Sequence, residues 1–328
     1  MGVVIGVDGG NTKTDLAVAT LDGELRAYFR GPGSNSHGLG SDGAVAVIAS
    51  LVDRAAFDRP AAHGAFFLCG ADVPHDIAEL SAEIDARAWV RRATVDNDTF
   101  ALLRAGTDNA DAIAVVCGAG INCVGRSADG RIARYPALGW ETGDWGGAEA
   151  LGREALFVAA RAEDGRGEPT VLVELVRSHF GLPTVAAVGE AVHYRRIRDV
   201  RLGELAPAVV SAAGAGDTVA RSLVERLADE VTLMVRRAVV DLGVREVDVV
   251  LGGGMLADGR GPLYDLVVAA LPSGARPVVP ELSPVAGAVL AALDAADAPA
   301  AAGERVRAAF GPTDVPDDVR EPRPSQPA

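Results

Sequence analysis

The chain has 328 residues, 49% of them hydrophobic and 23% charged, which is typical of a globular protein long enough for two domains. The formal net charge is −14, which argues against a nucleic-acid partner because proteins that bind the phosphate backbone present a basic surface. There is no run of about 18 apolar residues and no signal-peptide pattern at the N-terminus, so we expect a cytoplasmic protein that does not enter a membrane.

Short strands joined by tight turns are predicted at the start of the chain. Apolar runs at residues 3–8, 16–19 and 25–29 are separated by turn-forming residues, which indicates an antiparallel meander of three strands. The apolar spacing then alternates between helical and strand periods. The elements predicted from it are a helix at 44–57, a strand at 65–69, a helix at 76–89, a strand at 93–95 and a helix at 99–105.

The succession of strand, glycine turn, strand, turn and strand begins again near residue 112. Two like halves with a glycine turn in each suggest a duplicated fold whose halves face a shared cleft. We place the domains at residues 1–110 and 111–310 and expect a disordered tail at 311–328, which is rich in Pro and Asp and has no periodicity. The later elements are strands at 112–116, 121–125 and 131–135, helices at 148–162, 169–180, 184–197 and 218–242, strands at 247–251 and 277–279, and a helix at 284–293.

A polar, glycine-rich turn joins the first two predicted strands. Phosphate oxygens need several donors at one place, and adjacent glycines let backbone amides approach closely. Asp8 ends the first strand and is our candidate for holding Mg²⁺ through water. A plain hairpin turn is the alternative, because Asp-Gly and Gly-Asn pairs are common in hairpins. The candidate ATP-binding residues of this turn are Gly9, Gly10, Asn11, Thr12, Lys13 and Thr14.

Two further glycine turns, both in the second half, are candidate nucleotide contacts. Gly118, Ala119 and Gly120 repeat the strand–glycine–strand arrangement, and two such turns together would clamp a triphosphate. A second run follows the strand at 247–251 and would let a flat base lie against the backbone; it consists of Gly252, Gly253 and Gly254. Independent tight turns are the alternative explanation for both.

A pair of aspartates follows the predicted strand at 93–95. Transfer of a phosphoryl group to an alcohol needs a carboxylate that accepts the hydroxyl proton. We select Asp98 as the catalytic residue, with Asp96 as the competing candidate. A helix N-cap is the alternative role for Asp98, because a helix is predicted from residue 99.

Two polar segments are candidates for contact with a sugar. Residues 139–147 combine four glycines with polar side chains and two indoles just before a predicted helix. Asp144 is suited to hydrogen bonding with sugar hydroxyls or to helping hold a metal, and Trp140 and Trp145 offer an apolar face to a sugar ring. Asn35, in the loop after the third strand, offers both a donor and an acceptor. A helix N-cap with packed indoles and an ordinary polar loop are the structural alternatives.

Taken in this order, the motifs resemble those of the actin, sugar-kinase and heat-shock ATPase superfamily. Within it the chain is similar to the N-acetylglucosamine kinase branch, which is grouped with the ATPase activators of benzoyl-CoA reductase and 2-hydroxyacyl-CoA dehydratase. The resemblance spans residues 3–294. It implies an α/β fold of two ribonuclease-H-like (actin-like ATPase) domains around a central nucleotide cleft. The first domain would carry the sugar side and first phosphate loop, the second would carry a helical insertion and the adenosine loop, and the last helix would return toward the first domain.

The resemblance also implies an activity and its cofactors. An ATP-dependent and Mg²⁺-dependent kinase would phosphorylate the primary hydroxyl of an amino sugar, with N-acetylglucosamine leading over glucosamine, N-acetylmuramic acid and other hexose derivatives. Asp98 inherits the role of the base, and Asn35 and Asn122 match sugar-contacting positions. Asp144 falls where these kinases carry a Gly-Asp-Glu-Gly segment, but Trp145 replaces the acidic residue, which leaves the sugar undecided. Relatives suggest a homodimer.

Two other functions compete with the kinase. An ATPase activator of a radical dehydratase usually holds an iron–sulfur cluster through paired cysteines, whereas Cys117 and Cys123 lie inside and beside the second glycine turn. A non-catalytic sensor of a sugar or nucleotide would have no need for Asp8 and Asp98. Iron content separates the first alternative from a kinase, and ADP release separates the second.

Overall fold

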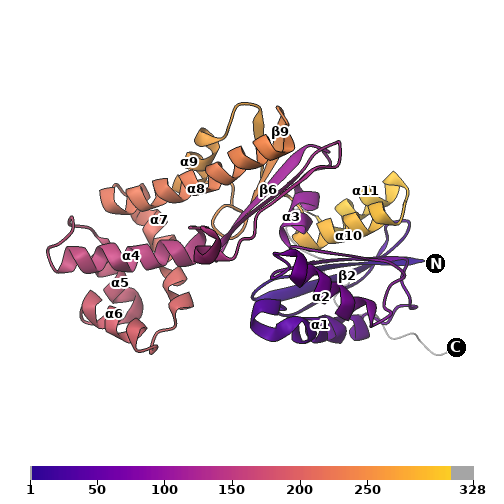
Figure 1. Ribbon diagram of the computed structural model, residues 1–328, viewed down its shortest axis with the longest axis horizontal. Helices are drawn as coiled ribbons and strands as arrows, with labels where there is room; N and C mark the ends of the chain where they lie inside the picture. The colour runs from indigo at the N-terminus through magenta and orange to yellow at the C-terminus, as the bar shows by residue number, and fades with distance from the viewer. Residues whose placement is uncertain (1, 312–328) are drawn as a thin grey trace. The chain divides into compact units, whose positions relative to one another are not determined.

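The computed structural model describes residues 2–311 and divides into two compact units, which Figure 1 colours by residue number. The described parts of the first unit are residues 2–108 and 280–311, and the second unit is residues 109–279. The sequence-based division assigns residues 280–310 to the second domain, with the last helix returning toward the first. The structure places these residues in the first unit, because the helix that follows residue 283 packs on its sheet, and the expected return of that helix is confirmed. Apart from Gly311, the predicted tail lies outside the described residues.

The first unit is built on a five-stranded sheet with the order β3-β2-β1-β4-β5. Strands β1, β2 and β3 are antiparallel, and β4 and β5 continue the sheet parallel to β1. The strands are β1 (Val3–Gly9), β2 (Lys13–Thr20), β3 (Leu25–Pro32), β4 (His63–Leu68) and β5 (Ala93–Asp96). The predicted meander and both later strands are therefore confirmed.

Helices cover both faces of this first sheet (Figure 1). Successive side chains of β1 alternate between two cores, since Ile5 and Val7 face α1 and α2 while Val4 faces α10 and α11. The helices are α1 (Ser36–Arg54), α2 (Pro74–Asp85), α3 (Thr99–Gly106), α10 (Pro284–Ala295) and α11 (Ala300–Phe310). The sequence analysis missed α11 and the first eight residues of α1, where three glycines interrupt the helical period.

The second unit repeats the same sheet with the order β8-β7-β6-β9-β10, three antiparallel strands followed by two parallel ones. The duplication predicted from the sequence is therefore confirmed at the level of strand order and direction. The strands are β6 (Ala112–Cys117), β7 (Ile121–Arg126), β8 (Ile132–Arg134), β9 (Val247–Gly252) and β10 (Ala275–Val278).

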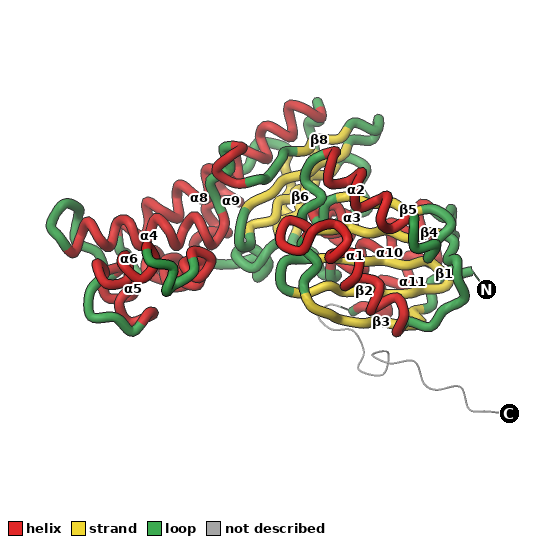
Figure 2. Tube along the Cα trace, turned by 60° about the horizontal axis from the view of Figure 1, so that its bottom comes forward, coloured by secondary structure: helices red, strands yellow, loops and turns green. Residues whose placement is uncertain are grey.

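The long connection between β8 and β9 is helical, as expected. Helices α4, α5 and α6 lie side by side in Figure 2, and α8 packs against the strands. The sequence analysis missed α7 and α9, two helices of nine residues each, although each has a proline in its first turn, which is a helix-start signal. The helices are α4 (Gly147–Glu163), α5 (Leu172–Phe180), α6 (Val185–His193), α7 (Ala206–Gly214), α8 (Thr218–Leu242) and α9 (Pro262–Ala270), with 3-10 helices at Gly139–Thr142 and Asp199–Leu205. Among residues 2–311, none of the helices has the length and apolar character needed to cross a membrane.

Candidate active site

A row of charged side chains crosses the first sheet near the predicted phosphate turn. Asp8 on β1 is paired with Asp15 on β2, and Asp15 is paired with Arg30 on β3. Residues paired across neighbouring strands point to the same face, so these three side chains are neighbours. Arg30 Nε donates to Asp15 Oδ1 at 2.6 Å, and Lys13 Nζ donates to Asp15 Oδ2 at 2.9 Å. The strand ends beside the turn therefore carry two carboxylates and two cationic side chains.

The turn between β1 and β2 is closed by its own backbone. The N–H of Gly10 donates to the carbonyl of Lys13 at 2.9 Å, and the N–H of Ser34 donates to the carbonyl of Gly10 at 3.1 Å. The side chains of Asn11, Thr12 and Lys13 are exposed and available to a ligand. Thr14 differs from the prediction in one respect. It is fully buried, and its hydroxyl donates to Ser34 Oγ at 2.9 Å, so its hydroxyl is used inside the protein.

Asp98 lies at the first turn of α3 without capping that helix. Asn97 performs the capping instead, since its Oδ1 accepts from the N–H of Thr99 at 2.9 Å. Asn97 Nδ2 also donates to Asp72 Oδ1 at 2.7 Å, so Asp72 holds the residue beside Asp98. The helix-cap alternative for Asp98 is therefore not supported. The Thr99 hydroxyl donates to Asp98 Oδ1 over a long distance of 3.5 Å.

The carboxylates of this region interact electrostatically. Loss of solvation, followed by the charges of Asp98 and Asp15, raises the pKa of Asp8 to about 8. Loss of solvation and the charge of Asp72 raise the pKa of Asp98 to about 6. The charge of Asp98 therefore disfavours the ionised form of Asp8, whereas the charge that acts in this way on Asp98 is that of Asp72.

This excess of negative charge fits a bound divalent cation. Mg²⁺ prefers oxygen ligands and commonly uses one or two carboxylates together with water and substrate phosphates. Asp8 and its neighbour Asp98 are of this kind. Within residues 2–311, no group of three or more His, Cys, Asp or Glu side chains is arranged as a metal site. A cation here would therefore depend on phosphate and water for most of its ligands.

Asn35 lies next to the phosphate turn through the tertiary structure. Its Oδ1 accepts from the N–H of His37 at 2.9 Å and caps α1, while its Nδ2 donates to Asn11 Oδ1. His37 Nε2 lies 3.7 Å from a carboxylate oxygen of Asp72 and of Asp76. Sequence reasoning missed Asp72 and this pairing of His37, because no local pattern connects the loop after β3 with the loop after β4.

The second glycine turn lies in the second unit, against the start of α4. The N–H groups of Ala148 and Glu149 donate to the carbonyls of Gly118 and Ala119 at 2.8 and 3.0 Å. Gly147 has a φ of +75°, and a side chain there would place its Cβ 2.4 Å from the Ala119 carbonyl oxygen. The first turn of α4 therefore holds the glycine turn through these hydrogen bonds, whereas Ala119 and Gly120 remain exposed to solvent.

The third glycine run lies beside the second turn within the same unit. The N–H of Met255 donates to the carbonyl of Cys117 at 3.0 Å. Gly253 has a φ of +80°, and a Cβ there would lie 2.5 Å from the backbone of Cys117, whereas a Cβ on Gly254 would meet nothing within 4 Å. The structure thus brings together Gly118–Gly120 and Gly252–Gly254, which are more than 130 residues apart in the sequence.

The remaining sugar candidates also belong to the second unit. Asp144 lies in the lining of a cavity of about 200 Å³, and its carboxylate accepts from the Thr142 hydroxyl. Asn122 Oδ1 accepts from the N–H of Cys123 at 2.7 Å. The Trp140 side chain is 89% exposed, whereas the Trp145 ring lies against the Arg226 guanidinium, 3.8 Å from its central carbon. Trp145 therefore helps to hold the loop, and Trp140 is the indole that remains free to meet a ligand.

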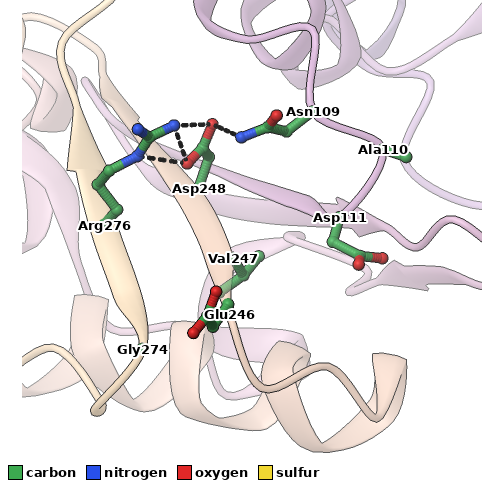
Figure 3. A pocket seen from close by; sticks show the side chains of 8 residues that line it. All are labelled: Asn109, Ala110, Asp111, Glu246, Val247, Asp248, Gly274 and Arg276. Atoms are coloured by element: carbon green, nitrogen blue, oxygen red, sulfur yellow. Dashed lines mark hydrogen bonds and ion pairs between the residues drawn. The ribbon is translucent and has the colours of Figure 1, made fainter.

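A larger cavity of about 520 Å³ lies elsewhere in the second unit, at the amino ends of β6, β9 and β10 (Figure 3). It contains none of the predicted site residues. The buried carboxylate of Asp248 accepts hydrogen bonds there from Arg276 and from Asn109 (Figure 3). The glycine turns of this unit follow the opposite ends of β6 and β9.

Known proteins are similar to this chain over most of its length. The N-acetylmuramic acid/N-acetylglucosamine kinase of Clostridium acetobutylicum is 28% identical over 273 residues, which cover 81% of this chain and 89% of that protein. The N-acetyl-D-glucosamine kinase of Dictyostelium discoideum is 23% identical over 287 residues, which cover 81% of this chain and 88% of that protein.

A solved structure and a protein family complete the comparison. The structure, from Chromobacterium violaceum and provisionally named an N-acetylglucosamine kinase, superposes with a TM-score of 0.68 at 22% identity and covers 88% of this chain and 98% of its own. This likeness shows the fold, that of the two-domain actin-like ATPases. Residues 5–292, most of the chain, match a family model of ATPases, and the chain belongs to the BadF/BadG/BcrA/BcrD ATPase family.

Proposed function

We propose that this protein transfers the terminal phosphoryl group of ATP to the primary hydroxyl of an amino sugar, and that its substrate is N-acetylglucosamine. The observation that carries the proposal is the pair of carboxylates beside the phosphate turn of the first unit, Asp8 near the end of β1 and Asp98 just after β5, where the charge of Asp98 helps to raise the pKa of Asp8. The names of the two curated relatives support this class of sugar. N-Acetylmuramic acid is the next candidate, because one of those names includes it.

Asp98 is the proposed base. Its carboxylate is not used to cap α3, and its raised pKa of about 6 makes it a better proton acceptor than an ordinary aspartate while it stays ionised at neutral pH. Asp96 is the weaker candidate, because its Oδ1 accepts from the N–H of Asn97 at 2.7 Å and so serves the turn itself. Asp98 would orient the sugar hydroxyl and take its proton late in the transfer.

The phosphates of ATP are proposed to lie on the turn that follows β1. The side chains of Asn11, Thr12 and Lys13 supply donors and a positive charge at one place. Gly9 and Gly10 are proposed to let the phosphates approach the turn closely, although the N–H of Gly10 is itself bonded to the Lys13 carbonyl. Thr14 contributes only its backbone, because its hydroxyl is occupied. Asp8 would hold Mg²⁺ through water, and Mg²⁺ would neutralise charge that develops on the phosphates.

In the second unit we assign Gly118, Ala119 and Gly120 to phosphate binding and Gly252–Gly254 to the adenosine. The lack of any neighbour within 4 Å of a Cβ at Gly120 or Gly254 supports room for a ligand there. For the sugar we assign Asn35 in the first unit, together with four residues already introduced: Asn122, Trp140, Asp144 and Asp98. Trp145, which replaces the acidic residue of the related kinases, packs on Arg226 and is left out of the sugar contacts.

A single assay tests the proposal. ADP release would be measured with ATP and Mg²⁺ in the presence of N-acetylglucosamine, N-acetylmuramic acid, glucosamine, glucose or no sugar. We expect the largest kcat/KM with N-acetylglucosamine and formation of its 6-phosphate, with little ADP release in the absence of sugar. Equal ADP release with and without sugar would contradict the proposal.

The two competing functions give different results in the same experiment. An activator ATPase would release ADP without sugar and would contain iron. Cys117 and Cys123 are fully buried, and Cys69 is partly buried, which argues against cysteines shared with a cluster at the surface. A sensor would bind nucleotide or sugar in calorimetry without any turnover.

Location and assembly complete the proposal. We assign the protein to the cytoplasm and to a homodimer in solution. Exposed apolar side chains of the second unit, Leu233 and Val240 on one face of α8, support a contact with another copy. Light scattering at several concentrations would test the dimer, and a constant monomer mass would rule it out.

A further inference from the structure

Asp15 is the most heavily hydrogen-bonded carboxylate near the phosphate turn, and the proposed mechanism does not use it. Its side chain is 1% exposed. Oδ1 accepts from Tyr28 Oη at 2.8 Å and from Arg30 Nε at 2.6 Å, while Oδ2 accepts from Arg30 Nη2 at 3.0 Å and from Lys13 Nζ at 2.9 Å. A carboxylate has room for about four such donors, so Asp15 is fully occupied.

The sheet itself builds this cluster. Lys13 and Asp15 are two residues apart on β2 and therefore point to the same face. Arg30 is directly opposite Asp15 on β3, and Tyr28 is opposite Ala17, one same-face step further along. Four side chains thus meet on a rigid part of the molecule, although Lys13 itself stands at the end of its strand where the turn begins.

The side chains of the cluster differ in their exposure to solvent, and this difference indicates which of them can meet a ligand. The side chain of Lys13 is 46% exposed, and that of Asp15 only 1%. Asp15 is therefore closed to a ligand, whereas the Lys13 ammonium is open to solvent beside the exposed side chains of Asn11 and Thr12. Arg30 and Lys13 together carry one more positive charge than Asp15 neutralises, so the Lys13 end of the cluster can still attract an anion.

A free lysine side chain has four rotatable bonds and loses much conformational freedom when it is fixed. The ion pair with Asp15 fixes the ammonium before any ligand arrives, and the bidentate Arg30 contact fixes Asp15 in turn. Although burial favours the protonated form of Asp15, hydrogen bonds from Arg30 and Lys13 outweigh it and lower the pKa of this carboxyl, so Asp15 stays ionised at neutral pH.

We propose that Asp15, held by Arg30 and Tyr28, is a positioning residue that sets the Lys13 ammonium at the phosphate turn for contact with ATP. This inference rests on the proposed kinase function, because it assumes that Lys13 meets a phosphate group. It goes beyond that function by assigning the orientation of the charge to residues that do not touch the nucleotide.

The sequence offers a direct probe, because Lys13 is its only lysine. Reductive methylation with ¹³C-formaldehyde labels Lys13 and the N-terminal amine, and methylation keeps the positive charge. In the wild-type protein we expect a Lys13 methyl signal with a shifted position and restricted motion. Asp15→Asn should move this signal to the position and narrow width of a free lysine. Asp129→Asn, which removes an exposed ion pair with Arg131 in the other unit, is the matched control and should leave the signal unchanged.

Kinetics test the link to ATP. Asp15→Asn should raise KM for ATP about tenfold while kcat changes by less than about threefold, which is the pattern of lost ground-state binding. KM for the sugar should not change. Lys13→Met should give a similar rise, and the double variant should be no worse than Lys13→Met, because the two residues act through one contact. Tyr28→Phe removes one donor and should raise KM for ATP by about threefold, which covers the case in which Asp15→Asn does not fold.

Three results would overturn the inference. The first is an Asp15→Asn protein with an unchanged Lys13 signal. The second is an Asp15→Asn protein whose affinity for ADP, measured by calorimetry, equals that of the wild type. The third is that Asp15→Asn and Lys13→Met have additive effects on KM for ATP. The spectroscopic and calorimetric measurements need no sugar turnover. A failure of the sugar kinase proposal, seen as no ADP release with any sugar, is therefore distinguishable from a failure of this one.

Discussion

The two units share one sheet topology but differ at the turn that follows their first strand. In the first unit this turn begins at Asp8 and ends at Lys13, and an ion-pair cluster on β2 and β3 supports it. In the second unit the corresponding turn, Cys117–Cys123, has no charged side chain and rests on the start of α4. The common topology therefore places a glycine turn at the same position twice, and charged side chains accompany only the turn of the first unit.

The largest effect is expected in the first unit, at Asp98. Asp98→Asn should lower kcat by a factor of about 10²–10⁴, because the sugar hydroxyl loses its proton acceptor. Asp96→Asn is the matched control, since Asp96 is two residues before Asp98, at the end of β5. Steady-state kinetics and melting temperatures of both variants give the answer. A large loss of kcat in Asp96→Asn with a normal Asp98→Asn would reverse the assignment.

The next largest effect is expected on protein stability at the glycine run of the second unit, where backbone conformation and not a charged side chain shapes the turn. Gly253→Ala would put a Cβ 2.5 Å from the backbone of Cys117 at a φ of +80°, so we expect a loss of about 1–3 kcal/mol in stability. Gly254→Ala meets nothing within 4 Å and should stay within about 0.5 kcal/mol of the wild type. Thermal unfolding followed by circular dichroism measures both. Equal melting temperatures for the two variants would contradict this account of the turn.

A smaller and pH-dependent effect is expected for the ion-pair cluster of the first unit. The pKa of Asp15 is lower in the folded protein than its ordinary value, so the unfolded chain binds more protons and stability rises with pH in this range. The contribution of Asp15 is complete above the unfolded pKa of about 4 and is lost as the pH falls through the folded value. Asp15→Asn should therefore cost about 1–2 kcal/mol at pH 7, and the difference from wild type should shrink below pH 4. Urea unfolding at several pH values measures this difference. A loss of stability in Asp15→Asn that does not change with pH would exclude an ionic origin for the contribution of Asp15.

The smallest effect concerns the loop of the second unit that carries Asp144. Arg226→Ala removes the guanidinium beside the Trp145 ring and should cost about 0.5–1 kcal/mol, with a change in tryptophan fluorescence. Arg221→Ala is the control, because Arg221 is an exposed residue of the same helix that pairs with Glu225 and contacts no indole. If both variants show the same fluorescence as the wild type, the ring contact has no role in holding the loop.

Sequence reasoning reached the local features of this molecule. Runs of apolar residues and the glycine pairs between them identified every strand of both sheets, because strand period and turn chemistry are encoded in neighbouring residues. The candidate turns and Asp98 were also found in this way. One local prediction needed correction, since Thr14 uses its hydroxyl inside the protein, and at Trp145 the stated alternative of a packed indole describes the contact with Arg226.

By itself, then, the sequence determined the two repeated sheets and the residues of the three glycine turns. Only the tertiary structure decided that the unit boundary falls before residue 280, that Asp72 lies beside Asn97, and that Asp15 accepts hydrogen bonds from Arg30 and Tyr28. These contacts join segments that are far apart or on different strands. Their formation depends on strand register and helix packing, which arise from the summed burial of many side chains and from no single local pattern.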